Sequence, residues 1–322
     1  MNNNQPLEFE KPLVELQRQL DELRHQSTGH QIDCSAEIEQ MEKKIAETRA
    51  RIYHDLTAWQ RVQIARHTGR PFMLDFVQHA FDDFFELHGD RHIGDDHSMP
   101  AGFGQIGGQR CVLVGHQKGR DLKENLKRNF GSAHPEGYRK ALRLMRLAER
   151  FHLPVITLID TPGAYPGIGA EERNIAEAIA FNLKEMMVLK TPIVSVVIGE
   201  GGSGGALGVG VADRVLMMEN SYYSVISPEG AAAILWKHRQ HAPEAAEALR
   251  ITAGQLKELG VIDGVIPEPE GGAHHDHPKA AANLRHAVLS SLQELESLPI
   301  DSLLAQRYAK FRAFGEFDEE DS

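Results

Sequence analysis

Residues 153–169 (LPVITLIDTPGAYPGIG) and 191–210 (TPIVSVVIGEGGSGGALGVG) share one plan. In each stretch a proline precedes an apolar, β-branched run, which then breaks into a cluster of glycines. Such a run is typical of a strand buried on both faces of a parallel sheet. Glycines at its end leave backbone N–H groups accessible, and a helix that begins there favours negative charge through its free N–H groups and its dipole. The two stretches therefore predict two anion-binding turns on neighbouring strands, suited to stabilise a developing oxyanion.

Around these stretches the predicted strands and helices alternate, which indicates an α/β fold with parallel pairing through right-handed crossovers. We expect strands at 154–160, 192–198 and 214–218, and helices at 136–151, 171–189, about 204–211, 230–239, about 254–259 and 280–298. Upstream, the pattern predicts a helix over 75–87 and, within 102–117, two strands joined by a turn at Gly107 and Gly108.

Residues 1–55 form a predicted helical segment ahead of the sheet. Apolar residues at helical spacing mark two amphipathic helices on either side of a loop at 27–33: Leu13, Leu16, Leu20 and Leu23, then Ile38, Met41, Ile45 and Ile52. This hairpin is either a cap packed on the main domain or an arm for an oligomer or partner. We expect residues 56–299 to form the main domain and 300–322 a tail whose acidic end, GEFDEEDS, is disordered.

Composition restricts the class of protein. The chain has 322 residues, of which 41% are hydrophobic and 25% charged, as in an ordinary globular protein. A net charge of −11 argues against a nucleic-acid surface. Two distant cysteines, Cys34 and Cys111, exclude a disulfide framework and a four-cysteine zinc site. No segment resembles a signal peptide or a membrane span, so we expect a cytoplasmic protein that does not bind membranes.

The second glycine cluster also matches two well-known motifs. Residues 199–204 fit the dinucleotide-binding pattern G-x-G-x-x-G, but the preceding strand lies in mid-chain rather than in a first βαβ unit. Residues 201–205 fit G-x-S-x-G, which would make Ser203 a nucleophile. A serine among glycines is more often a small residue that fits a turn, so we favour neither reading. Residue order alone does not exclude a hydrolase, because acids and histidines follow: Asp213, Asp263, His238, His241 and His274.

Three further features carry polar side chains. We expect His274, His275 and His277 to lie in a solvated surface loop rather than in a metal site. A basic patch after the 102–117 hairpin is either a solvated helix face or a contact for a phosphorylated or carboxylated ligand or an acidic partner: Lys118, Arg120, Lys123, Lys127 and Arg128. Asp160 is expected to cap the turn that follows it. No pair of carboxylates and no His–carboxylate pair stands out as acid–base machinery.

Six short motifs together resemble the carboxyltransferase α subunits of the multi-subunit acetyl-CoA carboxylases of bacteria and plastids. They are GHQKGR at 115–120, YRKA at 138–141, DTPGAYPG at 160–167, GAEE at 169–172, EGGSGGA at 200–206 and SPEG at 227–230. The resemblance runs from about residue 6 to about residue 310. It implies a crotonase-like fold, a spiral of ββα units. It also implies transfer of a carboxyl group from carboxybiotin, tethered to a biotin carboxyl carrier protein, to acetyl-CoA, giving malonyl-CoA for fatty acid biosynthesis.

The same resemblance implies partners. A β subunit, expected in an α2β2 complex, would complete the active site and carry zinc, while this chain holds no metal and no covalent cofactor. A separate biotin carboxylase would perform the ATP-dependent step, which agrees with the lack of a P-loop motif here.

Site residues follow from the matching motifs. Backbone N–H groups of Gly204 and Gly205 would hold the biotin oxyanion, and the β subunit would hold the thioester oxyanion. The remaining substrate-binding residues that we expect are Thr161, Pro162, Gly163, Tyr165, Gly202, Ser203, Lys118 and Arg120.

Overall fold

The computed structural model describes residues 6–30 and 34–315. Its centre is a sheet with the strand order β1-β2-β3-β4-β5-β6-β8, and β7 pairs with the end of β5. Pairing is antiparallel from β1 to β3 and parallel from β3 to β8. The strands are β1 (Asp83–Glu86), β2 (Ala101–Ile106), β3 (Gln109–Gly115), β4 (Val155–Thr161), β5 (Ile193–Gly202), β6 (Arg214–Met218), β7 (Tyr222–Ser224) and β8 (Gly264–Ile266).

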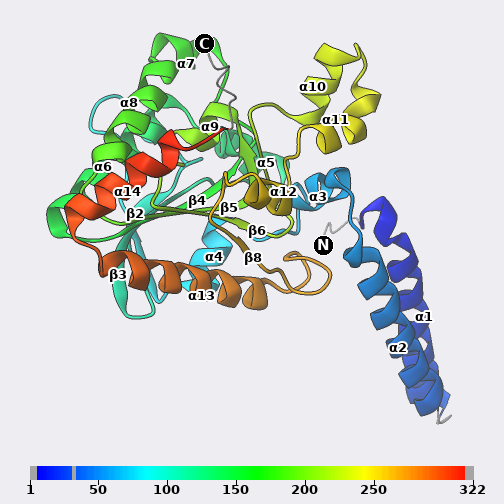
Figure 1. Ribbon diagram of the computed structural model, residues 1–322. Coiled ribbons are helices and arrows are strands. Elements are labelled where there is room, and N and C mark those ends of the chain that lie inside the picture. The colour runs from blue at the N-terminus through cyan, green and yellow to red at the C-terminus, as the bar shows by residue number, and fades with distance from the viewer. Residues whose placement is uncertain (1–5, 31–33, 316–322) are drawn as a thin grey trace, which may run out of the picture.

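Helices cover both faces of this sheet (Figure 1). One face packs against α6 (Pro135–Phe151) and α8 (Ile175–Val188), and the other against α4 (Met73–Ala80) and α13 (His277–Glu296). Every residue of β4 and β5 is buried between these layers. Burial on both faces explains why both runs are mainly apolar rather than alternating between apolar and polar residues.

Shorter helices connect these elements. They are α3 (Ala58–Ala65), α5 (Leu122–Lys127), α7 (Ile168–Glu172), α9 (Ser203–Leu207), α10 (Pro228–Leu235), α11 (Ala242–Ala248) and α12 (Ala253–Glu258), with 3-10 turns η1 (Glu8–Glu10), η2 (Asn129–Gly131) and η3 (Arg239–His241). Helices α10 and α11 form a pair that projects from the main body (Figure 1). No helix among the described residues has both the length and the apolar character needed to cross a membrane.

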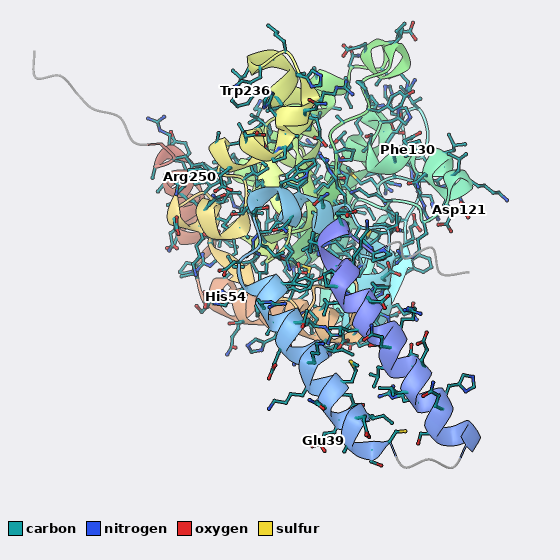
Figure 2. The ribbon with its side chains drawn as sticks, turned by 90° about the vertical axis from the view of Figure 1, so that its right-hand side faces the viewer. Glu39, His54, Asp121, Phe130, Trp236 and Arg250 are labelled. Atoms are coloured by element: carbon teal, nitrogen blue, oxygen red, sulfur yellow. The ribbon has the colours of Figure 1, made fainter. Side chains whose placement is uncertain are left out.

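The N-terminal helices form the predicted hairpin, which extends away from the sheet (Figure 1). Helix α1 (Lys11–His30) packs along α2 (Ser35–His54), and Leu13, Leu20 and Ile45 are buried between them. Figure 2 shows Glu39 near the far end of the hairpin and His54 near the core. The predicted loop at 27–33 is wrong in its first part, because α1 continues through His30.

Other boundaries differ from those predicted as well, and the helices expected at about 204–211 and at 230–239 both end four residues early. The helix expected over 75–87 ends at Ala80, and the strand β1 follows, paired with β2. The helix expected over 171–189 is divided at Asn174, whose φ is 63°. Strand β5 continues to Gly202 because its last residues pair with β7.

Residues 300–322 are not simply a tail. Ile300–Arg312 form helix α14, which packs against α8. The side chain of Arg307 is fully buried, and its guanidinium donates hydrogen bonds to both carboxylate oxygens of Asp213. The predicted disorder of the acidic end falls on residues 316–322, which lie outside the described residues.

Deleting residues 1–55 is expected to weaken assembly with partner subunits more than it destabilises the core. The apolar residues of the hairpin form a small cluster of their own, separate from the two clusters that flank the sheet. Thermal unfolding of the truncated chain measures the stability of the core, and sedimentation with the partner subunit measures assembly. An unchanged complex would show that the hairpin is only a cap, and an unfolded core would show that the division at residue 55 is wrong.

Candidate active site

The two glycine turns are in direct backbone contact where β4 and β5 end. Thr161 of β4 pairs with Gly201 of β5. A Cβ atom on Gly202 would lie 2.2 Å from the Pro162 carbonyl oxygen, so only glycine allows this approach. Thr161 holds the first turn, because its hydroxyl donates to the Gly163 carbonyl and accepts from the Gly163 N–H.

Helix α9 begins at Ser203, directly after β5. The first N–H groups of a helix have no partner earlier in the helix, so the amides near Gly204 and Gly205 are available as donors. Ser203 itself has a φ of 48°, in the left-handed region, and its side chain is exposed. The sequence places a serine at a position where glycine is the usual choice.

A buried ion cluster lies at the same end of the sheet. The ammonium of Lys118 donates to Asp160 Oδ1 and to Glu200 Oε2, both at 2.6 Å. Asp160 Oδ1 also accepts the N–H of Glu200, which joins β4 to β5. Burial opposes protonation of Lys118, but the two carboxylates outweigh it and raise its pKa. Next to Lys118 in sequence, fully buried His116 has its pKa lowered to about 3 by burial and by the lysine charge.

Arg66 of the C-terminal end of α3 extends this cluster. Its guanidinium donates to Glu200 Oε1 at 2.7 Å and also pairs with Glu229 of α10. The Tyr222 hydroxyl donates to the same Glu200 oxygen. Burial opposes ionisation of Glu200, but Lys118 and Arg66 outweigh it and hold its pKa at about 2. Segments that are distant in sequence, around residues 66, 118, 160, 200 and 222–229, are therefore tied together beside the glycine turns.

An apolar pocket of about 400 Å³ opens beside Ser203. Its lining includes Tyr223 of β7, Val225 just after β7, and Phe311 and Phe314 at the C-terminal end of the described chain. It lies next to the start of α9, because Ser203 and Leu207 also line it. The pocket is therefore suited to an uncharged group held close to the α9 amides.

Known proteins resemble this chain over almost its whole length. The family described as acetyl co-enzyme A carboxylase carboxyltransferase-like matches residues 6–315. The chain belongs to this family. The α subunit of acetyl-coenzyme A carboxylase carboxyl transferase of Syntrophotalea carbinolica is 58% identical, over 95% of this chain and 97% of the relative. The corresponding subunit of Thermus thermophilus is 54% identical, over 98% and 99%.

Solved structures confirm the crotonase-like carboxyltransferase fold. Transcarboxylase 12S superimposes with a TM-score of 0.59 at 19% identity, over 74% of this chain and 44% of that one. A chain of a Pseudomonas malonate decarboxylase hetero-tetramer superimposes with a TM-score of 0.56 at 18% identity, over 74% and 95%. At these identities the likeness concerns the fold alone.

In this member of the carboxyltransferase-like family, most residues expected at the site do lie together. Thr161, Pro162 and Gly163 form one turn, and Gly202 to Gly205 form the other. Tyr165 lies further along the first turn, where its ring packs on His134 at 4.2 Å between centroids. Arg120 contacts a different set of groups, the Asp75 carboxylate and the carbonyls of Thr68 and Arg70.

Three expectations about polar groups are corrected. Lys118 does not lie on a solvated helix face, because only 12% of its side chain is exposed and both neighbours are carboxylates. Asp160 does not cap its own turn but binds Lys118 and the N–H of Glu200. Asp160 and Glu200 also form a carboxylate pair, which sequence reasoning missed along with Arg66. One indication in the sequence that Glu200 lies at the site was its position in the glycine motif at 200–206.

The loop that carries His274 and His275 is also different from the expected solvated loop. His274 is buried, and its Nε2 lies 3.0 Å from Glu10 Oε1. His275 is half-exposed and faces the same carboxylate. His277 is the first residue of α13, and its Nε2 contacts the Gly69 carbonyl at 2.7 Å.

Proposed function

We propose that the chain is the α subunit of an acetyl-CoA carboxylase carboxyltransferase. It transfers the carboxyl group from carboxybiotin on a carrier protein to acetyl-CoA and so forms malonyl-CoA. Identity of 54–58% to α subunits of matching length carries this assignment. The arrangement of the glycine turns supports it, because both stages of the transfer develop negative charge on an oxygen atom.

The backbone amides at the start of α9 are the proposed catalytic groups. When the carboxyl group leaves biotin, charge collects on the ureido oxygen of that substrate. The N–H groups of Gly204 and Gly205 would stabilise this charge without a charged side chain. Loss of one such donor typically costs about 2.7–4 kcal/mol of transition-state stabilisation. Gly202, Ser203, Thr161, Pro162, Gly163 and Tyr165 would line the substrate-binding surface around them.

Lys118 has a positioning role in this proposal. Its two short contacts join the ends of β4 and β5, from which both turns extend. Arg120 is one exposed member of the basic patch that would contact a ligand, since 39% of its side chain is exposed, and Lys123 and Lys127 are exposed as well. A phosphate group of the coenzyme A substrate suits a guanidinium of this kind.

Partner subunits complete the proposal. We infer a β subunit that supplies the thioester oxyanion site and zinc, an α2β2 assembly, a biotin carboxyl carrier protein and a biotin carboxylase. The end of α10 supports a partner surface, because Ile234 and Leu235 are 61% and 65% exposed there. A cytoplasmic location stays a prediction.

The isolated chain is expected to show little carboxyltransferase activity, because it contains only one of the two proposed oxyanion sites. Malonyl-CoA decarboxylation with biotin as the acceptor, measured with and without a β subunit, tests this. Full activity of the chain alone would contradict a shared active site. Hydrolysis of a thioester by the chain alone, with labelling of Ser203 by a serine-reactive probe, would favour a hydrolase instead.

A further inference from the structure

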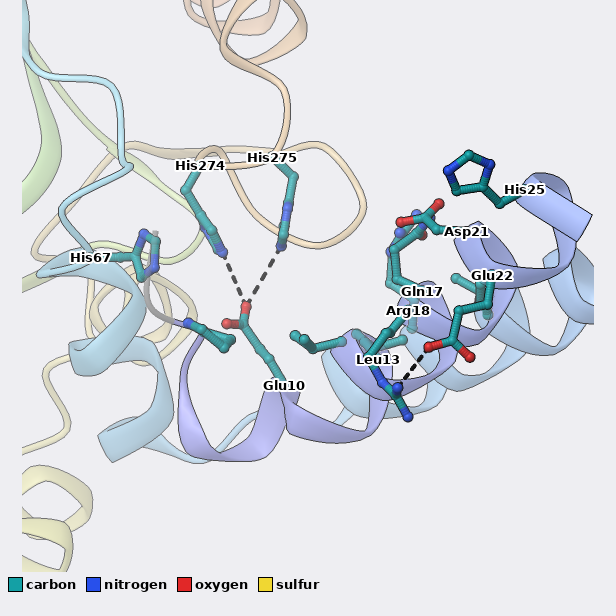
Figure 3. Close-up of a pocket in the computed structure, with 14 residues that line it drawn as sticks. Glu10, Leu13, Gln17, Arg18, Asp21, Glu22, His25, His67, His274 and His275 are labelled. Carbon is teal, nitrogen blue, oxygen red and sulfur yellow. Dashed lines mark hydrogen bonds and ion pairs between the residues drawn. The ribbon is translucent and has the colours of Figure 1, made fainter. Parts of the chain in front are cut away.

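A buried carboxylate lies where the base of the N-terminal hairpin meets the core. Glu10 ends the turn η1, and its Oε1 faces His274 Nε2 at 3.0 Å and His275 Nε2 at 3.6 Å. Figure 3 shows both rings pointing at this carboxylate from the loop that precedes α13. The contact therefore joins two segments that are 264 residues apart.

We propose that Glu10, His274 and His275 bind a divalent transition-metal ion, with Zn²⁺ the best match, which fastens the N-terminal hairpin to the core. This site is independent of the proposed carboxyltransferase chemistry.

The geometry of the three donor atoms supports a metal ion. They lie within 4.8 Å of one another. In a tetrahedral zinc site with ligand bonds of about 2.0–2.1 Å, neighbouring ligand atoms are ~3.3 Å apart. The observed separations of 3.0 and 3.6 Å from Glu10 Oε1 lie on either side of that value. Two imidazoles and one carboxylate are also a ligand set that zinc accepts, with water in the fourth position.

The charge balance supports a cation as well. The Glu10 side chain is only 5% exposed. Among the described residues, its ion-pair partners are these two imidazoles, and no lysine or arginine nitrogen lies within 4.0 Å of it. A buried carboxylate without a fixed positive charge is unfavourable, and a bound divalent ion would supply that charge.

Surrounding groups hold the ligands in place. The Leu7 N–H donates to Glu10 Oε2 at 2.7 Å, and the Tyr53 hydroxyl donates to Oε1. The His67 ring packs against His274 at 4.4 Å between centroids. Nδ1 of His274 has no hydrogen-bond partner within the described part of the chain. In this contact His274 Nε2 donates to the Glu10 carboxylate, which can only accept a hydrogen bond. Nε2 can therefore bind a metal once its proton moves to Nδ1 or leaves the ring.

Access to the site is open on one side. The three ligands line one end of a groove of about 670 Å³ that runs along α1 (Figure 3). Water from this groove can occupy the fourth coordination position. His275, half-exposed at the rim, gives the ion a path to enter.

Metal binding to the full-length chain tests the proposal. The protein carries no histidine tag and is treated with a chelator before titration with Zn²⁺ in a calorimeter and with Co²⁺ in an absorption spectrometer. We expect one ion per chain and a visible Co²⁺ spectrum of four-coordinate type. His275→Ala and Glu10→Gln should each weaken binding at least tenfold. His54→Ala, which removes an exposed histidine at the end of α2, should leave binding unchanged.

Hydrogen exchange gives a second readout that does not depend on activity. Zn²⁺ should slow amide exchange in residues 8–10 and 272–275 and raise the melting temperature of the unaltered chain by a few degrees, but not that of His275→Ala. Because His275 is half-exposed, that variant is expected to fold. Absence of binding, equal binding by all variants, or protection confined to other segments would each overturn the proposal.

Discussion

Replacing Gly205 with alanine is expected to lower the carboxyltransferase activity of the assembled complex by roughly 10²-fold or more. A Cβ atom at this position would lie 2.5 Å from Ala164 N and from the Gly163 carbonyl carbon. These are backbone atoms that cannot rotate away, so either the first turn or the start of α9 must move. Because the proposed oxyanion donors are the α9 amides, such a shift removes at least one donor from its working position.

Two matched variants separate this effect from other causes. A Cβ atom on Gly204 would meet only Ile179 Cδ1, at an ordinary 3.7 Å, so Gly204→Ala should keep activity within about tenfold. Ser203→Ala removes the hydroxyl but keeps Cβ and the backbone amide, and it should also stay within about tenfold. Turnover number, melting temperature and binding of the β subunit are measured for all three.

Two results would contradict the proposed role of the α9 amides. If Gly205→Ala is as active as Gly204→Ala, the close packing of the two turns does not matter for catalysis. If Ser203→Ala abolishes turnover in a folded complex, Ser203 takes part in the chemistry and the amides of Gly204 and Gly205 are not the essential groups.

The central strands of the sheet could be predicted from the sequence, because burial on both faces gives each strand a run of mainly apolar residues. The strand expected at 214–218 is β6, and the helix expected at 136–151 is α6. The hairpin turn at Gly107 and Gly108 is confirmed because both glycines have the positive φ that such a turn requires.

Elements that depend on distant partners were missed. Phe84 and Phe85 looked helical after α4, yet they form β1 because β2 offers its edge about 20 residues later. Helix α14 falls in the predicted tail because it packs through contacts with distant segments, such as the bond from Arg307 to Asp213, 94 residues earlier. Propensity over a short window contains no information about such contacts.

The same limit applied to the site. Glycine clusters mark backbone turns by composition alone, so Gly202 to Gly205 could be singled out from sequence. The ion cluster could not, since Glu200 meets Arg66 from 134 residues away and Lys118 from 82 residues away. A run of basic residues in sequence therefore suggested one surface patch, whereas Lys118 turns inward and Arg120 stays at the surface.

Because Lys118 is buried and Arg120 is not, we expect the loss of Lys118 to lower the stability of the protein strongly. Lys118→Met is expected to reduce the free energy of unfolding by about 3–5 kcal/mol, the usual result of removing one partner of a buried ion pair. The side chain of Asp160 is only 1% exposed, and without Lys118 it loses its cation. Arg120→Met is the matched control, and it should change stability by no more than about 1 kcal/mol because this pair is exposed and screened by solvent.

A double variant shows whether the loss comes from the unpaired carboxylate. Asp160→Asn removes the negative charge but keeps an oxygen that can accept the Glu200 N–H. Combined with Lys118→Met, it should therefore be less destabilising than the sum of the two single changes, as measured by urea unfolding in a double-mutant cycle. Additive losses would mean that the charges do not interact. If Lys118→Met instead leaves stability unchanged and raises KM alone, Lys118 contacts substrate directly and does not act by joining the strand ends beneath the glycine turns.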